Sequence, residues 1–409
     1  MRCSLVLVSL FLLPPLTTAR QVVAADELRL QKIASDDFAL EVFDNSPTLS
    51  QALAINATGQ IIGLREVADE AGTQLSQRPF FIEGQQMTTI PLLEDYSNLE
   101  IRALSDTGLV VGYASRPLGH PQGSVTGFVW DSKTGKMTRL MPADQDIACH
   151  AQGISGDGTR ITGYTAGSEP SRMLPCLWTW DESQNTWLAE TLDSIDDLNP
   201  YIMSSSVLIS PDGQRIVACI TVDKPSVNVF DSSLVQWTHI DGQWQRKLLS
   251  DEQLYLSSIN NAGQIAGTIT TQAGRQPCMV DAAGKIAMID LLPGDVSGEA
   301  RGINADGTVV GFSDDPLGPE GGPQAFVWHQ GTAVPMLLPE GTTASMAIDI
   351  NDAGQIAGLL DVLRVDTSAP SDTGPSKDSD STDSDGSTVV DEPSVQTLAF
   401  RWTPKPGVK

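Results

Sequence analysis

Hydrophobic and polar residues alternate in short segments along most of the chain, and one pattern returns seven times. In its first copy, ALAINATGQIIG at 52–63, an apolar segment leads into a polar turn and then into a second apolar segment. Alternation over four to eight residues predicts a half-buried β-strand, and a short turn between two such segments predicts a β-hairpin. The later copies begin at residues 101, 151, 207, 257, 300 and 347, so the sequence predicts seven hairpins.

Each hairpin turn begins with Asn or Ser and carries Gly three residues later. The pairs are Asn56/Gly59, Ser105/Gly108, Ser155/Gly158, Ser210/Gly213, Asn260/Gly263, Asn304/Gly307 and Asn351/Gly354. An Asn or Ser side chain accepts a hydrogen bond from the backbone two residues on, and Gly adopts a positive φ without a Cβ clash. We therefore interpret these residues as parts of type I turns with a glycine bulge, and not as ligand-binding residues.

Every hairpin is followed by an aromatic or apolar segment, such as GFVWDS at 127–132 or AFVWHQ at 325–330, and in six units by a fourth segment, such as KMTRLM at 136–141. Four strands in a repeat of 44 to 55 residues are typical of a β-propeller blade. The predicted fold is all-β, a seven-bladed β-propeller of four-stranded blades over residues 38–405. The last unit lacks a fourth strand, and FALEVFD at 38–44 has the pattern to supply it beside residues 398–402.

The pattern A-x-x-IN-x-x-GQ, followed by AFxW and an apolar strand that ends in LL, resembles the HAF family of bacterial extracellular repeats. ISPDGQRIVA at 209–218 and GISGDGTRITG at 153–163 look more like the turns of WD40-like propellers. The resemblance covers nearly all of residues 38–402. It implies a scaffold or binding surface, and it also implies closure of the ring by an N-terminal outer strand.

Both ends of the chain and one internal segment fall outside the repeat pattern. Residues 1–25 have a basic start, the apolar run CSLVLVSLFLL and a small-residue region VVAA, which together predict a secretory signal peptide. Residues 26–37 form an N-terminal lead before the first propeller strand. Residues 364–396 are dominated by Ser, Asp, Thr and Pro, which predicts a disordered acidic insertion within the last blade. We expect a secreted protein, in the periplasm, at the cell surface or outside the cell, without a membrane span.

The net charge of −26 and the isoelectric point near 4.3 disfavour nucleic acid and anionic lipid as partners, because both are negatively charged. A protein, a glycan or a cell-envelope component stays open as the partner, and we expect a monomer. Six tryptophans are interpreted as recurring at one blade position and are expected in the core between blades: Trp130, Trp178, Trp180, Trp237, Trp328 and Trp402. Trp187 and Trp244 lie on outer strands.

Four cysteines follow the signal peptide: Cys149, Cys176, Cys219 and Cys278. None forms a CxxC pair, which argues against zinc, and three lie in or beside apolar strands, where cysteine is usually a small buried residue. A bridge between Cys149 and Cys176 of one blade stays open. DSDGSTVVDE at 383–392 offers Asp383, Asp385 and Glu392 as weak Ca²⁺ candidates, but the first ligand position of such a loop would be Ser381, so we assign no metal and no cofactor.

Loops on one propeller face vary most, and variable loops on a rigid scaffold usually carry binding. Two of them, in units two and six, share a PLGxxxG core. Many face loops carry acids: Asp69, Glu70, Asp95, Asp144, Asp146, Asp196, Asp197, Asp314 and Asp315. His120 and His150 fall in candidate face loops, His239 closes a strand, and His329 is expected in solvent at a turn.

The sequence contains no HExxH, GxSxG, Walker A or dinucleotide-binding motif, so no catalytic residue is assigned. The favoured function is a non-enzymatic binding or scaffold module that acts through loops on one face. The alternatives are an extracellular polysaccharide hydrolase or lyase with acidic residues at the axial face, and a structural cell-envelope component. An enzyme would require His, Asp, Glu or Arg side chains that converge at the mouth of the axis, whereas acids scattered on loop tips would favour binding.

Overall fold

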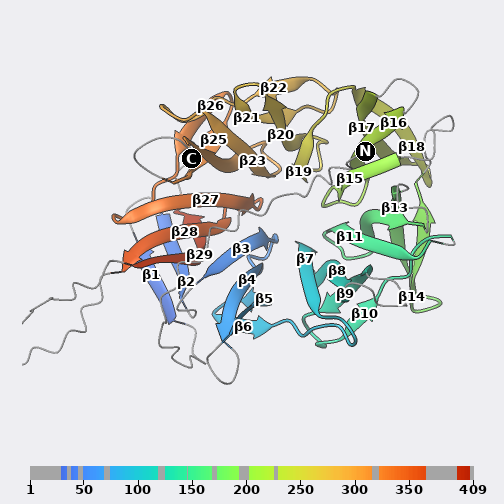
Figure 1. Cartoon of the computed structure of the whole chain (residues 1–409), viewed down its shortest axis with the longest axis horizontal. Helices are drawn as coiled ribbons and strands as arrows, with labels where there is room; N and C mark the ends of the chain where they lie inside the picture. Colours follow the sequence, from blue (N-terminus) through green and yellow to red (C-terminus); the bar gives the residue numbers. More distant parts are fainter. Residues whose placement is uncertain are drawn as a thin grey trace, which may run out of the picture.

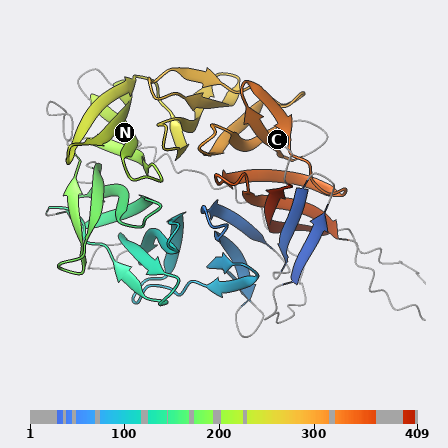
Figure 2. The ribbon, with the colours of Figure 1, turned by 180° about the vertical axis from the view of Figure 1, so that it is seen from behind.

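The computed structural model shows seven antiparallel β-sheets arranged in a ring around a central axis (Figures 1 and 2). The structure describes residues 29–34, 38–44, 49–68, 74–117, 125–144, 146–167, 173–192, 202–224, 229–315, 322–364 and 394–405. The predicted all-β, seven-bladed propeller is confirmed. The signal peptide at 1–25 and nearly all of the acidic insertion lie outside the described residues.

The blades are numbered along the chain, and their strands are given from the axis outwards. Blade 1 contains β3 (Ser50–Ile55), β4 (Ile61–Ala68), β5 (Leu75–Glu83) and β6 (Gln86–Thr89). Blade 2 contains β7 (Asn98–Leu104), β8 (Leu109–Ser115), β9 (Val125–Asp131) and β10 (Met137–Arg139). Blade 3 contains β11 (Ala148–Ile154), β12 (Arg160–Ala166), β13 (Met173–Asp181) and β14 (Thr186–Thr191).

Blade 4 contains β15 (Ile202–Ile209), β16 (Arg215–Lys224), β17 (Val229–Ile240) and β18 (Gln243–Ser250). Blade 5 contains β19 (Tyr255–Ile259), β20 (Ile265–Thr271), β21 (Gly274–Val280) and β22 (Ile286–Met288). Blade 6 contains β23 (Ser297–Ile303), β24 (Val309–Asp314), β25 (Gln324–His329) and β26 (Thr332–Pro335). Blade 7 contains β27 (Thr342–Ile350), β28 (Ile356–Arg364), β29 (Ser394–Pro404), β2 (Phe38–Asp44) and β1 (Arg29–Ala34).

The N-terminal strand β2 and the last strand β29 meet in blade 7, as the sequence predicts. Strand β2 pairs with β29 in antiparallel register, from Phe38 opposite Pro404 to Phe43 opposite Ala399. The structure adds one strand to the prediction, because β1 pairs with the outer edge of β2 and gives this blade five strands. Residues 29–34 had been assigned to the N-terminal lead, since the polar segment RLQKIA lacks the apolar pattern of the other strands.

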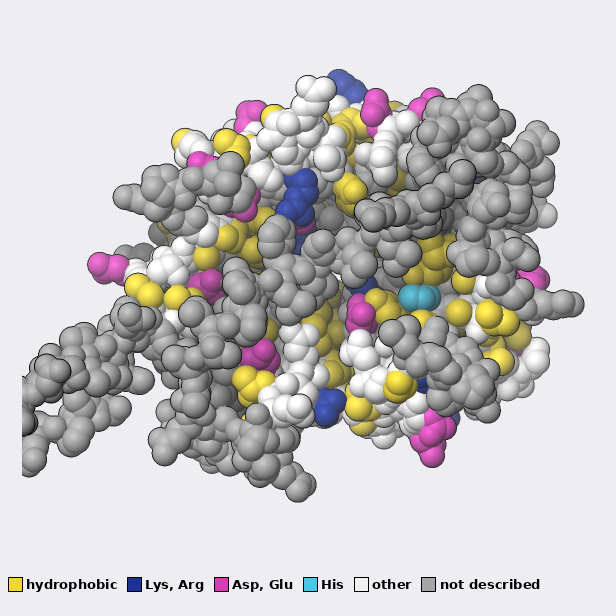
Figure 3. All heavy atoms as spheres, in the orientation of Figure 1, with side chains coloured by type: hydrophobic (Ala, Val, Ile, Leu, Met, Phe, Trp, Pro, Cys, Tyr) yellow, Lys and Arg dark blue, Asp and Glu magenta, His cyan; other side chains and the backbone are white. Residues whose placement is uncertain are grey.

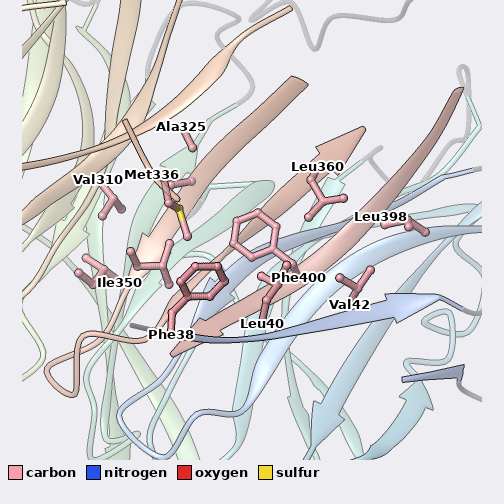
Figure 4. Close-up of a cluster of buried hydrophobic side chains, with 12 residues drawn as sticks. Phe38, Leu40, Val42, Val310, Ala325, Met336, Ile350, Leu360, Leu398 and Phe400 are labelled. Atoms are coloured by element: carbon pink, nitrogen blue, oxygen red, sulfur yellow. The ribbon is translucent and has the colours of Figure 1, made fainter. Parts of the chain in front are cut away.

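Side chains of β2 are shared between the two faces of blade 7, because successive residues of a strand point to opposite faces. Phe38, Leu40 and Val42 pack with Phe400 and other residues in the core that blade 7 shares with blade 6 (Figure 4). Phe43 points the other way, into the core shared with blade 1 that includes Ile61 and Phe80. One N-terminal strand therefore seals both junctions of the last blade.

The seven hairpin turns fold as predicted. In blade 1 the Asn56 side-chain oxygen accepts hydrogen bonds from the backbone N–H groups of Thr58 (3.1 Å) and Gln60 (2.9 Å). Gly59 has a φ of +80°, a conformation that strains other residues. In the Ser turns of blades 2 to 4 the serine hydroxyl is the acceptor of the backbone N–H, as in the bond from Leu109 N to Ser105 Oγ at 2.9 Å.

The turns also bond from blade to blade, and the sequence alone had not indicated this. The Asn56 side-chain amide donates to the Ser105 carbonyl of blade 2 at 2.8 Å. Every further junction carries a bond between turn segments: Asp106 N to Gly156 O (2.9 Å), Gly156 N to Pro211 O (2.8 Å), Asp212 N to Asn261 Oδ1 (2.8 Å), Asn260 Nδ2 to Asn304 O (2.9 Å), Asn304 Nδ2 to Asn351 O (3.5 Å) and Asn351 Nδ2 to Asn56 O (2.9 Å). We call this closed series the turn ring.

A second type of contact links the start of an inner strand to the preceding blade. Ser50 Oγ accepts the Ala399 N–H at 2.9 Å, and Ser345 Oγ accepts the Ala325 N–H at 3.0 Å. Cys149 occupies the equivalent place in blade 3, where its Sγ accepts the Gly127 N–H at 3.3 Å. This cysteine is therefore a partner of the backbone at a junction.

The bridge between Cys149 and Cys176 does not form. The two residues lie on β11 and β13, and β12 runs between these strands in the sheet. Neighbouring strands are about 4.8 Å apart, so the two Cα atoms exceed the roughly 7 Å limit for a disulfide. All four cysteines are buried free thiols, and burial raises the pKa of Cys149 to about 11 and that of Cys278 to about 12.

Each inner strand contains a β-bulge shortly before its turn. The ladder shifts register between Ile101 and Ala103 in blade 2 and between Ala300 and Gly302 in blade 6, and the inner strands of blades 1, 3, 5 and 7 shift at the equivalent place. In blade 4 the shift lies between Ser204 and Val207. The unpaired residue in blades 2 and 6 is arginine, Arg102 or Arg301. A bulge re-aims side chains and twists its strand, and here it does so close to the axis.

The insertion predicted at 364–396 is bounded by paired strands, with Arg364 of β28 directly opposite Ser394 of β29. Its described ends are thus neighbours in one sheet. None of the described segments forms a helix with the length and apolar character needed to cross a membrane.

Truncation tests the closure of the ring. We expect a chain that starts at residue 35 to melt close to the full-length protein, since it loses only the additional edge strand β1. A chain that starts at residue 45 also loses four buried side chains, worth roughly 2 kcal/mol each and together comparable to the stability of a domain. It should unfold at much lower temperature or aggregate, as measured by circular dichroism melting and size-exclusion chromatography. Equal melting temperatures for the two truncated chains would contradict the closure.

Candidate functional site at the axial mouth

The inner strands place one residue of each blade near the mouth of the axis, at the end opposite the turn ring. This residue precedes the first turn residue by five positions. It is Gln51, Glu100, His150, Tyr255, Glu299 or Met346 in the blades whose side chain at this position is described. None of the six is buried, and on this face acidic, basic and histidine side chains lie close together over the inner strands (Figure 3).

Blade 2 carries an ion pair at this position. Arg102 Nη2 lies 3.1 Å from Glu100 Oε2, and it also donates to the Tyr113 hydroxyl at 3.2 Å. The Tyr113 pKa is raised, mainly because the phenol is buried and also because its hydroxyl bonds to Glu100. The side chains of Arg102 and Glu100 remain 42% and 39% exposed, so both keep free hydrogen-bonding positions toward solvent.

Aromatic rings continue this cluster into blade 3. The Arg102 guanidinium lies 5.4 Å from the centre of the Tyr113 ring. The Tyr113 and His150 rings are 4.3 Å apart, and the His150 and Tyr164 rings are 4.4 Å apart and stacked at 21°. We call Arg102, Tyr113, His150 and Tyr164 the mouth stack. Burial, with a smaller contribution from the charge of Arg102, lowers the His150 pKa to about 4, so this imidazole is neutral at pH 7.

Blade 6 repeats the arrangement with a second arginine. Arg301 Nη1 lies 3.4 Å from Glu299 Oε2, and Arg275 of β21 pairs with the same carboxylate. Phe312 takes the place of Tyr113, with the Arg301 guanidinium 5.9 Å from its ring centre. Both clusters thus have Glu five and Arg three residues before the turn, in the two blades that share the PLGxxxG loop core. Their inner strands, β7 and β23, lie on different sides of the axis (Figure 1).

Acids of the predicted face loops join the second cluster. The Asp314 pKa is raised because the carboxyl is partly buried, and Asp295, Glu299 and Asp315 add to this effect while Arg275 opposes it. Ser313 donates a hydrogen bond to Asp295 at the same place. Asp314 and Asp315 are therefore part of a charged cluster and do not project alone from a loop tip.

The other predicted site residues have different outcomes. The prediction that His150 lies in a loop is wrong. The residue lies within β11, because its ring fills the space between two tyrosines. His329 is exposed at a turn, as predicted, and its Nδ1 lies 3.0 Å from Thr308 Oγ1. Asp95 and Asp144 adopt positive φ in loops of blades 1 and 2. Asp146 is partly buried between β10 and β11, where its backbone N–H donates to the Ala143 carbonyl at 3.2 Å. The other acids of the prediction, His120 and the Ca²⁺ candidates lie outside the described residues: Asp69, Glu70, Asp196, Asp197, His120, Asp383, Asp385 and Glu392.

Among the residues that the structure describes, no three His, Cys, Asp or Glu side chains are grouped as a metal site would require. Sequence reasoning missed Glu100, Arg102, Glu299 and Arg301. The available signal was the recurrence of Glu-x-Arg at the same distance from the turn in two of seven repeats.

The tryptophan prediction holds for four of six residues without change. Trp130, Trp178, Trp237 and Trp328 are buried, and Trp402 is partly buried against the blade 7 core, where it stacks on Phe38 at 5.7 Å. The prediction is wrong for Trp180, which lies two residues beyond the shared position. It lies near the end of β13 and is partly exposed beside Trp187.

No model of a protein family matches the sequence, and no curated protein matches it. A structure from a study of two prolyl endopeptidases matches with a TM-score of 0.52 at 11% identity, over 76% of this chain and 45% of that chain. The β-propeller domain of the Trilobed protease from Pyrococcus furiosus matches with a TM-score of 0.49 at 11% identity, over 83% and 91% of the two chains. Pyrococcus horikoshii acylaminoacyl peptidase gives 0.47 at 11% identity, over 76% and 49%.

At such identities the likeness concerns the fold alone. The chain spans about half the length of the two larger peptidase structures that it matches.

The neutral state of His150 predicts a pH dependence of stability. A histidine whose pKa is lowered by folding stabilises the protein fully above about pH 6.5, and this contribution is lost as the pH falls toward 4. The variant His150→Phe keeps a ring between the tyrosines but takes up no proton. Urea unfolding between pH 7 and 4.5 should show a loss for the wild type that exceeds the loss for His150→Phe by about 1–2 kcal/mol. His329→Gln is the control at an exposed histidine and should behave as the wild type. Equal losses of stability in all three proteins would contradict the neutral, buried state of the His150 imidazole.

Proposed function

We propose that this chain is an exported β-propeller that binds its partner at the axial mouth and serves as a recognition or scaffold module. Export rests on the signal-like residues 1–25, and the scaffold role is what the likeness to HAF-type extracellular repeats implies. The partner is a protein, a glycan or another component of the cell envelope. The protein acts as a monomer, without a metal or cofactor.

The observation that carries this proposal is the repeated Glu–Arg pair. Glu100/Arg102 and Glu299/Arg301 stand at equivalent positions of blades 2 and 6, both at the mouth and both with partly exposed arginines. Side chains that only stabilised the inner strands would need no charge, and the five other blades have uncharged residues at the position of the arginine: Leu53, Gln152, Val207, Ser257 and Ile348. Exposed donors and acceptors on rigid strands are suited to orienting a polar ligand.

The pairs favour recognition over proton transfer. The Glu100 carboxylate already bonds to Arg102 and Tyr113, and Glu299 faces two arginines. A general base needs a carboxylate free to accept a proton from the substrate, and a general acid needs a protonated one. A hydrolase or lyase would therefore have to use residues other than these two, so we favour the binding module.

Binding at the mouth can be tested on the mature chain with a glycan array and a pull-down of envelope components, each with and without Ca²⁺. Arg102→Ala combined with Arg301→Ala should weaken capture of the bound component at least tenfold, because each substitution removes an exposed charged donor. Lys247→Ala on the outer strand β18 is the matched control for loss of an exposed cation and should leave capture unchanged. Equal capture by the double variant and the control would place binding elsewhere, and turnover of an arrayed polymer would favour the enzyme.

A further inference from the structure

A groove on the outer side of the ring, away from the axial mouth, lies between blades 2 and 3. Its volume is about 110 Å³. Blade 2 contributes Lys136, Thr138, Arg139 and Met141, and blade 3 contributes Trp180, Asn185, Thr186 and Trp187. The groove thus combines two indole rings, two cations and three neutral hydrogen-bonding side chains.

The two tryptophans form an aromatic pair across the outer hairpin of blade 3. Trp180 of β13 lies opposite Trp187 of β14, with ring centres 5.3 Å apart and an interplanar angle of 60°. Neither ring is fully buried. The buried tryptophan of this blade is Trp178, whose indole N–H donates to the Met141 carbonyl at 2.7 Å, so core packing does not require Trp180 as well. Partly exposed indole faces are suited to the apolar face of a sugar ring.

The cations of the groove have no acidic partner among the residues that the structure describes. No described carboxylate lies within ion-pair distance of Lys136 or Arg139, although the chain carries 51 acidic residues and only 25 Lys and Arg. The acid nearest to Lys136 in sequence, Asp131, uses its carboxylate within its own turn, where it accepts from Lys133 N (2.9 Å) and Thr134 Oγ1 (2.8 Å). Arg139 lies 5.6 Å from the Tyr96 ring. Two unpaired cations beside two indoles favour a ligand that carries both an anion and a ring.

At the equivalent position of blade 4, an arginine of the neighbouring blade already covers the aromatic pair. There His239 and Trp244 stand where blade 3 has Trp180 and Trp187, with ring centres 5.0 Å apart. Arg160 of blade 3 covers the Trp244 ring at 5.7 Å. This arginine also donates to the Gly213 carbonyl at 2.9 Å. The blade 4 pair therefore serves the junction between blades, whereas the blade 3 pair lines a groove.

We propose that the groove binds a carboxylated sugar residue, such as a uronic acid unit of an acidic polysaccharide. The sugar ring stacks on Trp187 and Trp180, its carboxylate accepts hydrogen bonds from Lys136 and Arg139, and its hydroxyls bond to Thr138, Asn185 and Thr186. The proposal concerns a short part of a polymer, because the chain carries a net charge of −26, which repels a longer anionic polymer. This site is independent of the axial mouth.

The probes are an oligogalacturonate of four residues, a neutral galactan oligomer of four residues and a tetraglutamate peptide. Each is titrated into the full chain and followed by tryptophan fluorescence and calorimetry. The oligogalacturonate should bind, and the neutral oligomer and the peptide should bind at least tenfold more weakly, since the first lacks the carboxylates and the second lacks the sugar rings. Equal affinity of the peptide would show a simple cationic site, and equal affinity of the neutral sugar would show that the cations have no role. Absence of oligogalacturonate binding would also overturn the proposal.

Variants assign the binding to this groove. Trp187→Ala, and separately Lys136→Ala combined with Arg139→Ala, should each weaken oligogalacturonate binding at least tenfold while circular dichroism shows the fold unchanged. Trp244→Ala is the matched control at the equivalent position of blade 4, and Lys247→Ala on β18 is the control for loss of an exposed cation. Both should bind as the wild type does. Wild-type affinity in the Trp187→Ala variant would overturn the assignment.

Discussion

The hydrogen bonds of the turn ring are the constraint on which the rest of this propeller depends. Seven sheets can close only if each junction has the same geometry, and at every junction a turn segment of one blade bonds to the turn segment of the next. At the last junction Asp349 adds a second bond, because its carboxylate accepts the Ile55 N–H at 3.0 Å. Burial raises the pKa of this carboxyl to about 6. Strand β2 completes the same closure at the outer edge of blade 7.

This closure fixes the inner strands at the end that carries the turns. At the other end, near the axial mouth, the residues differ from blade to blade. The turn residues and the bulge recur in every blade, whereas the residue five positions before the turn ranges from Met346 to Glu299. Arg102 is aimed by a bulge and held by Tyr113, so it lies in a fixed position before any ligand arrives. Preorganised donors of this kind lower the entropic cost of binding. The fold thus places different side chains at equivalent positions of strands that its turns hold in place.

The sequence predicted the seven hairpins, the blade count and the closure by residues 38–44, because these follow from local periodicity and turn chemistry. It did not predict that Asn351 bonds to blade 1. The Asn351 side-chain oxygen accepts a hydrogen bond within its own turn, whereas its amide nitrogen donates to the Asn56 carbonyl of the neighbouring blade. His150 was placed in a loop because its segment lacks strong apolar alternation, while ring stacking keeps it in a strand. Trp180 was grouped with the core tryptophans, but its position two residues later carries it to the groove. Contacts between blades decide all three, and these are invisible to local patterns.

The variant Asn351→Ser tests the central claim most directly. Serine preserves the acceptor that the turn needs, as Ser105, Ser155 and Ser210 show in other blades, but it removes the amide that donates to Asn56 O across the last junction. Chemical unfolding should show a loss of about 1 kcal/mol in the free energy of unfolding, with faster hydrogen exchange at the junction of blades 7 and 1. Asn98→Ser at the exposed start of β7 is the control and should change neither quantity. If Asn351→Ser unfolds and exchanges as the wild type does, the turn ring does not hold the propeller closed.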